Sequence, residues 1–218
     1  MISADPSAVA KLPVAPKQAR GAERVESLLD AAAALVAEHG PTGFPFREVA
    51  RRARTAQGSL YQFFPSREAV LVALHERYAG QAVDLAELAI ADAQGATDTE
   101  GVANAGGAAQ WCDALAASIV KRFLPFYRDA PGYGAIRHWA VSNDVSRVED
   151  DADARIVAEL ATAIAAHSHQ ASDPARIAQT VIEIADALLP LAALDHAWVK
   201  EAERAIAAYL KDRLKDDR

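Results

Sequence analysis

The side chains best suited to molecular recognition lie in residues 47–67, which contain several arginines, two glutamines and a cluster of three aromatic residues. Gln62 can form two hydrogen bonds with the N6 and N7 atoms of adenine, and Gln57 is a second candidate for such a contact. The Tyr61 hydroxyl sits on a rigid ring and suits a phosphate oxygen. A nearby arginine could pair with a phosphate, although for any arginine, as for Gln62, a solvated helix face is the plain alternative. The chemistry predicted here is contact with nucleic acid.

A short helix must hold these side chains, because Leu60 and Phe64 are four residues apart and therefore share one face. We expect that face to be buried, which leaves the small and polar side chains of the same helix on the outside. Gly58 has no side chain, so the backbone could approach a groove closely. Phe63 could pack on a DNA sugar or on the protein body.

Helical patterns extend on both sides of this segment. Apolar residues recur with helical spacing over 25–36, and Gly40 is placed to end that helix in the left-handed conformation. The stretch FREVARRA, residues 46–53, predicts a second short helix. Ser66 is expected to cap a long fourth helix, with Glu68 in its first turn. Three short helices followed by a long one predict a helix-turn-helix headpiece on a larger helical body.

The segment 23–74 resembles the N-terminal DNA-binding region of the tetracycline-repressor (TetR/AcrR) family. The resemblance depends most on the run Gly58-Ser59-Leu60-Tyr61, then Phe64, then Ser66-Arg67-Glu68. It implies that Tyr61 contacts the phosphate backbone, and that a C-terminal domain binds a small effector and forms a homodimer. The DNA-contact residues that we expect are Arg47, Arg54, Thr55, Ala56, Gln57, Gly58, Ser59, Tyr61, Gln62, Phe63 and Arg67.

The segment departs from the family pattern at three places. Arg54-Thr55-Ala56 stands in the turn where members usually have Gly-Val-Ser, and a positive φ at Arg54 would cost about 1 kcal/mol relative to glycine. Pro45 replaces a usual threonine, and we expect it at the first helical position. Phe63 replaces a usual histidine or tyrosine. These departures keep a second hypothesis open, in which an all-helical ligand-binding or catalytic protein has a headpiece that no longer reads DNA.

Composition and charge support two parts with different partners. The 218 residues are 51% hydrophobic and 24% charged, which suits a globular protein. The net charge of −7 is uneven: residues 1–77 carry ten Lys/Arg and eight Asp/Glu (+2), and residues 78–218 carry thirteen and twenty-two (−9). Chance variation in composition along the chain is an alternative explanation of this uneven charge. A mildly basic front and an acidic rear nevertheless fit a DNA-binding part joined to a part with another role.

The predicted fold class is all-α, with no strand, in three segments. Residues 1–20 are expected to be a disordered arm, 21–80 the TetR-type DNA-binding domain with its motif at about 45–64, and 81–218 the effector-binding and dimerisation domain. A loose loop is expected at 94–107. The further helices are predicted at 108–129, 131–142, 146–169, 173–192 and 196–214.

Two residue sets in the acidic part are candidates for the roles that the resemblance implies. Aromatic residues between 111 and 139 could line an effector cavity, although their helical spacing is also typical of plain core. Apolar stripes on the last two helices could form a four-helix dimer interface, or be buried within one subunit. The cavity candidates are Trp111, Phe123, Phe126, Tyr127, Tyr133, His138 and Trp139, and the interface candidates are Ile177, Val181, Ile184, Leu188, Trp198, Ala202, Ile206 and Tyr209.

Other chemistry finds no support in the sequence. The stretch HERYA at 75–79 has Ala79 where a zinc protease needs its second histidine, and neither a P-loop nor a GxSxG elbow is present. Cys112 is expected to be a small buried hydrophobe rather than a redox sensor. We therefore expect no catalytic residue, metal or cofactor. With no signal peptide and no membrane span expected, the predicted location is the cytoplasm, and the predicted partners are operator DNA, a small-molecule effector of unknown identity and a second copy of the chain.

Overall fold

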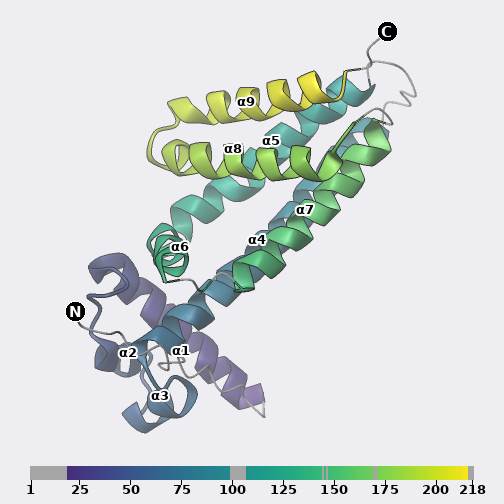
Figure 1. Cartoon of the computed structure of the whole chain (residues 1–218). Coiled ribbons are helices and arrows are strands. Elements are labelled where there is room, and N and C mark those ends of the chain that lie inside the picture. Colours follow the sequence, from purple (N-terminus) through teal and green to yellow (C-terminus); the bar gives the residue numbers. More distant parts are fainter. Residues whose placement is uncertain (1–18, 99–106, 144, 146, 169–170, 216–218) are drawn as a thin grey trace, which may run out of the picture. The chain divides into compact units, whose positions relative to one another are not determined.

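The computed structural model describes residues 19–98, 107–143, 145, 147–168 and 171–215, which form nine helices and contain no strand (Figure 1). The all-α prediction is therefore confirmed for these residues. The helices are α1 (Ala19–His39), α2 (Phe46–Arg52), α3 (Gln57–Phe63), α4 (Arg67–Asp98), α5 (Gly107–Asp129), α6 (Tyr133–Ser142), α7 (Arg147–His167), α8 (Pro174–Leu194) and α9 (Ala197–Arg213).

The chain packs as two compact units. The headpiece unit contains residues up to Tyr78 together with Pro131–Val148, and the body unit contains Ala79–Ala130 and Glu149–Arg218. Helix α4 belongs to both, because its residues 67–78 lie in the first unit and 79–98 in the second.

The headpiece unit has a core built from apolar positions of α1 to α4. The helix ends follow the sequence: Gly40 has a φ of 75° after α1, and the Ser66 hydroxyl accepts a hydrogen bond from the Ala69 N–H at 3.2 Å. Pro45 is not the first helical residue as predicted but the N-cap of α2, because its φ of −75° and ψ of 101° are extended. Its carbonyl accepts from the Glu48 N–H at 2.9 Å. The largest fully buried side chains of this core are Leu28, Leu35, Phe44, Leu60, Phe64, Leu71 and Leu74.

Helix α6 packs with the headpiece rather than with the rest of the segment that follows residue 80. The Tyr78 hydroxyl donates to the Pro131 carbonyl at 2.7 Å, and the Tyr78 and Tyr133 rings meet edge to face with centroids 5.5 Å apart. Gly132 precedes α6 with a φ of 72°, and a Cβ there would lie 3.1 Å from Cγ1 of Val36. Our functional division at residue 80 stays a prediction, but residues 131–148 belong to the headpiece in packing.

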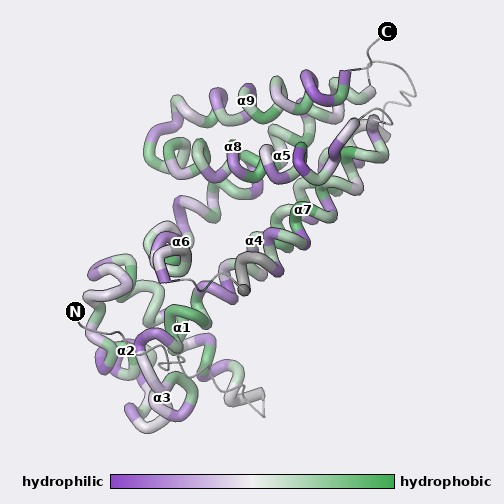
Figure 2. Tube along the Cα trace, viewed as in Figure 1, coloured by the Kyte–Doolittle hydropathy of each residue, from purple (hydrophilic) through white to green (hydrophobic). Residues whose placement is uncertain are grey.

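The body unit is organised around α5, α8 and α9, whose buried side chains form one cluster. Polar and apolar residues alternate turn by turn along α9, as an amphipathic surface helix requires (Figure 2). Helix α8 is long and apolar enough to cross a membrane by composition alone. It carries Arg176, Glu183 and Asp186, however, and it buries Ile177 and Val181 in the cluster, which identifies it as a core helix.

The remaining differences concern segment ends. Helix α4 continues to Asp98, so the loop predicted at 94–107 is wrong for residues 94–98 and for Gly107, where α5 begins. Residues 99–106 of that prediction lie outside the described residues. The disordered arm predicted for 1–20 also lies outside them, except for residues 19 and 20, which begin α1.

Candidate nucleic-acid interface

Helix α3 has one anchored face and one exposed face. Leu60 is fully buried and Phe64 is 1% exposed, as the sequence predicts. Tyr61 is 44% exposed, and Gln57 and Gln62 are also exposed. The two glutamines and the tyrosine are therefore presented to solvent from a helix that the core holds in place.

A second aromatic residue supports the Tyr61 ring. The rings of Phe46 on α2 and Tyr61 on α3 meet edge to face, with centroids 5.4 Å apart and an interplanar angle of 83°. Such pairs are stabilising beyond the area that they bury, and they restrict the orientation of each ring. The phenol is thus held by a neighbour on the preceding helix while its hydroxyl remains outside.

Phe63 belongs to the anchored face. Its side chain is only 8% exposed, which favours the alternative that Phe63 packs on the protein body rather than on a DNA sugar. The signal was present in the sequence, because a residue three positions after Leu60 lies on the same side of a helix as one four positions after it.

Two arginines of α2 are engaged within the protein. Arg51 pairs with Glu48, its Nε lying 2.8 and 2.7 Å from the two carboxylate oxygens, and Arg52 pairs with Glu38 at 2.7 and 3.0 Å. These hydrogen bonds lower the pKa of both carboxyl groups. Arg47 is exposed and forms no such pair with a described residue, so it is the α2 arginine best placed to meet a phosphate.

Arg67 has a role within the fold. Its Nη1 donates to the Thr42 carbonyl at 2.7 Å, and its guanidinium lies over the Phe44 ring, 5.2 Å from the centroid. The side chain therefore ties the start of α4 to the connector between α1 and α2. The contact of Arg67 with DNA stays a prediction, and this positioning role is one that the sequence did not predict.

The turn between α2 and α3 contains a backbone outlier. Arg54 has a φ of 52°, which makes it the one non-glycine residue with positive φ among those described. The Arg54 N–H donates to the Arg51 carbonyl at 3.1 Å and the Thr55 N–H to the Ala50 carbonyl at 2.9 Å. The left-handed conformation considered from the sequence is therefore present. Thr55 and Ser59 are partly exposed, and Ala56 and Gly58 are exposed.

The predicted cavity residues are divided between the two units, and their role as an effector cavity stays a prediction. Tyr133, His138 and Trp139 lie in the headpiece unit, whereas the other four lie in the body unit. Trp111 is fully buried and belongs to the core cluster. The Tyr127 hydroxyl donates to Oδ1 of Asp186 at 2.6 Å and so connects α5 with α8. Phe123 and Phe126 are partly exposed.

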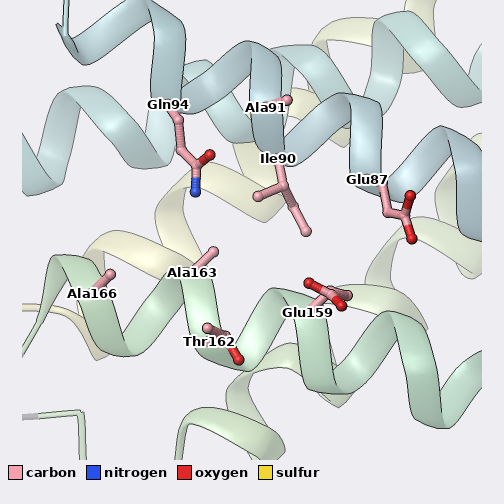
Figure 3. Close-up of a pocket in the computed structure, with 8 residues that line it drawn as sticks. All are labelled: Glu87, Ile90, Ala91, Gln94, Glu159, Thr162, Ala163 and Ala166. Carbon is pink, nitrogen blue, oxygen red and sulfur yellow. The ribbon is translucent and has the colours of Figure 1, made fainter.

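The body unit has a groove of about 260 Å³ between α4 and α7, lined by none of those seven residues. Ile90 points into it from α4, the carboxylates of Glu87 and Glu159 lie toward one end, and the Gln94 amide lies toward the other (Figure 3). Arg155 pairs with Glu87 at 2.5 Å. The remaining lining residues are Ala91, Thr162, Ala163 and Ala166.

The predicted dimer residues are mostly used within the subunit. Ile177, Val181, Ala202 and Ile206 are at most 1% exposed, so the alternative of burial within one subunit holds for these four. Ile184, Leu188 and Tyr209 are partly buried against the same cluster. Trp198 is 40% exposed, and two residues that we did not predict, Leu191 and Leu194, are 39% and 88% exposed.

Two family models match the chain. The model described as bacterial regulatory proteins of the tetR family matches residues 28–74, which include α2 and α3. The model described as a tetracyclin repressor-like C-terminal domain matches residues 113–213. No curated protein matches the chain in sequence.

Solved structures resemble the chain over most of its length. A TetR-family transcriptional regulator from Streptomyces coelicolor is 26% identical, with 88% of this chain and 99% of that chain covered and a TM-score of 0.57. NemR from E. coli in its reduced form is 21% identical (88% and 98% covered, TM-score 0.62). AibR in complex with isovaleryl coenzyme A and operator DNA is 18% identical (84% and 97% covered, TM-score 0.51).

Proposed function

The chain belongs to the TetR family of bacterial transcriptional regulators, and we propose that it acts as a homodimeric repressor that binds a palindromic operator and is released by a small-molecule effector. The operator-binding proposal rests on the fact that α3 has one buried side and one exposed side. Its buried side holds the helix, and its other side presents Gln57, Tyr61 and Gln62 to solvent. A cytoplasmic location follows from the same proposal, because the partner is chromosomal DNA.

Helix α3 would enter the major groove, which admits one helix. Gln62 would pair with the N6 and N7 atoms of an adenine, and Gln57 would contact a neighbouring base edge. Tyr61 and Arg47 would bind phosphates, which fix the position of the helix without selecting a sequence. The T-shaped contact with Phe46 supports this role for Tyr61, because it orients the ring before DNA arrives.

Two headpieces are required for a palindromic site, and their spacing would control affinity. The recognition helices of a dimer must lie about 34 Å apart, or a multiple of that distance, to enter successive major grooves. An effector releases the operator if it binds more tightly to a state with another spacing. We place the effector in the groove between α4 and α7, because α4 continues into the headpiece unit. The AibR structure, which holds both a ligand and operator DNA, supports the compatibility of this fold with both partners.

Binding to the DNA upstream of the protein's own gene tests the proposal. We expect a sequence-specific complex in an electrophoretic shift assay, weakened by Tyr61→Phe through a lost phosphate contact. Gln62→Ala should reduce the preference for the operator over scrambled DNA by roughly 5- to 150-fold for each half-site, since a bidentate base contact is worth about 1–3 kcal/mol. Gln81→Ala, an exposed glutamine of α4 in the body unit, is the matched control. A folded dimer that forms no specific complex at any salt concentration would support the ligand-binding or catalytic hypothesis instead.

A further inference from the structure

Three described residues have a positive φ: Gly40, Gly132 and Arg54. Glycine adopts this conformation without a steric penalty, whereas a residue with a Cβ is disfavoured there. The first two positions therefore follow the usual rule. Arg54 departs from it, in the turn that sets the start of α3.

No described residue stabilises the side chain of Arg54 in this conformation. Its side chain is exposed and makes no hydrogen bond or ion pair with a described residue. The turn is closed by backbone hydrogen bonds, from the Arg54 N–H to Arg51 and from the Thr55 N–H to Ala50, and a glycine would make the first of them equally well. A strained residue that contributes nothing to packing points to a function outside the subunit.

The charge of Arg54 is also not paired with an acidic side chain among the described residues. Arg51 and Arg52 are each paired with a glutamate, whereas Arg54 precedes the N-cap residue Ala56 of α3 by two positions. Its guanidinium is therefore a cation at the leading end of the helix that presents Gln57 and Tyr61. A guanidinium is suited to bidentate binding of a phosphate.

We propose that Arg54 is a DNA-positioning residue whose guanidinium binds a backbone phosphate beside the recognition helix, and that the fold gives up stability at this turn in exchange for DNA affinity. The inference deepens the proposed operator binding and rests on it. It assigns Arg54 a sequence-independent role, distinct from the base contacts of Gln57 and Gln62.

The test compares Arg54→Gly, Arg54→Asn and Arg54→Lys with the wild type by urea unfolding and by fluorescence anisotropy on two 30-base-pair duplexes. One duplex comes from upstream of the gene and the other is its scrambled sequence. We expect Arg54→Gly to raise the urea midpoint and to weaken binding to both duplexes about 5- to 20-fold. The slope of log K against log salt should fall in magnitude by about 1.8, because each of the two subunits of the proposed homodimer loses one phosphate contact and each contact contributes about 0.9.

The other variants separate strain from charge. Arg54→Asn, which tolerates positive φ but is neutral, should lose affinity like Arg54→Gly, and Arg54→Lys should keep the salt slope while losing part of the affinity. Arg204→Gly is the control: this exposed arginine lies within α9, so glycine should lower the urea midpoint and leave DNA binding unchanged.

The outcomes distinguish this inference from the proposed function. A wild type that binds both duplexes equally overturns specific operator binding. The Arg54 proposal is overturned if Arg54→Gly has the wild-type salt slope on the scrambled duplex, because a phosphate contact does not depend on sequence. It is also overturned if Arg54→Gly loses affinity without gaining stability.

Discussion

At the residue scale, the surroundings of Cys112 favour a structural role over a redox role for the single thiol of the chain. Its side chain is fully buried, and burial raises its pKa to about 11. At pH 8 the native thiolate fraction should therefore be on the order of 100-fold below that of an ordinary cysteine. We expect Ellman's reagent to react with the native protein at least about 100-fold more slowly than with the protein unfolded in urea.

The matched control for this experiment is Cys112→Ala, which should show no reaction and retain operator binding. Rapid labelling of the native protein would contradict the structural role. The structural role would also be contradicted if peroxide treatment reversibly abolished operator binding by the wild type but not by Cys112→Ala. A conformation that exposes the thiol would then have to be populated.

The sequence specified most of α3 residue by residue, but not all of it. The four-residue spacing of Leu60 and Phe64 was enough to identify the buried face, and the exposure of Tyr61 and Gln62 followed. For Phe63 the sequence allowed packing on a DNA sugar or on the protein body, and its exposure of 8% favours the protein body. The role of Arg67 could not be predicted, since its partners Thr42 and Phe44 are distant in sequence.

At the element scale, the approach of α6 to α1 depends on one glycine. Gly132 has a φ of 72°, and a Cβ there would lie 3.1 Å from Cγ1 of Val36 and 3.2 Å from the Ala37 nitrogen. Gly132→Ala should lower the free energy of unfolding by about 1–3 kcal/mol, because it adds both backbone strain and a clash. The free energy is measured by urea denaturation.

Gly134→Ala is the matched control, two residues further along the same segment. Gly134 lies within α6, and a Cβ there would meet no atom within 4 Å. Alanine should therefore leave stability unchanged or raise it by up to about 1 kcal/mol. If both variants had the same effect, the close approach of α6 to α1 would not hold in solution.

The packing of α4 against α6 should give the protein a pH dependence. Burial lowers the pKa of His75, and the positive charge of Arg137 on α6 lowers it further. Below about pH 6.5 the unfolded chain then binds a proton that the folded chain resists, so stability falls as the pH decreases from 6.5 toward the folded pKa. At pH values below both pKa values, the free energy of unfolding is lower by about 1.4 kcal/mol for each tenfold difference in proton affinity between the unfolded and folded chains.

We expect the free energy of unfolding to be lower at pH 5 than at pH 7.5, and His75→Gln to reduce that difference. Comparing wild type and variant at both pH values isolates His75 from other groups. Glu76, for example, has a pKa that burial raises, so it acts in the opposite direction and is common to both proteins. An identical pH dependence in the two proteins would exclude a contribution from His75.

Helix boundaries were largely predictable, but helix partners were not. Periodicity and caps placed α5 to α9 within two residues at each end, because these signals are local. The continuation of α4 to Asp98 overrode the weak helical preference of a Gly- and Thr-containing stretch. The packing of α6 with the headpiece depends on Tyr78 and Gly132, whose contacts lie more than 50 and nearly 100 positions away in the sequence.

At the scale of the whole molecule, the proposed dimer needs an apolar surface that the subunit leaves open. Four of the eight predicted interface residues are consumed by the core of the body unit, because periodicity identifies an apolar face without showing what covers it. The exposed apolar side chains at the end of α8 and the start of α9 are Leu191, Leu194 and Trp198. Residues of this kind are typical of subunit interfaces.

Leu194→Asp should weaken the proposed dimer without unfolding the subunit. Leu194 is 88% exposed, so its replacement removes little from the core of the subunit. Burying a leucine side chain contributes about 1.5–3 kcal/mol, and a buried aspartate adds an unpaired charge, so the dimer dissociation constant should rise at least about tenfold. Sedimentation velocity over a dilution series measures the change.

Leu88→Asp is the matched control, because Leu88 is 46% exposed but lies on α4 rather than at the α8–α9 end. If the interface uses α8 and α9, only Leu194→Asp should shift the dimer toward monomer. Operator affinity should fall with it, since a monomer can occupy one half-site and loses the gain from binding two linked half-sites together. A dimer that is unaffected by Leu194→Asp but is broken by Leu88→Asp would move the interface to the α4 surface, and the groove between α4 and α7 would then compete with the partner subunit for the same face.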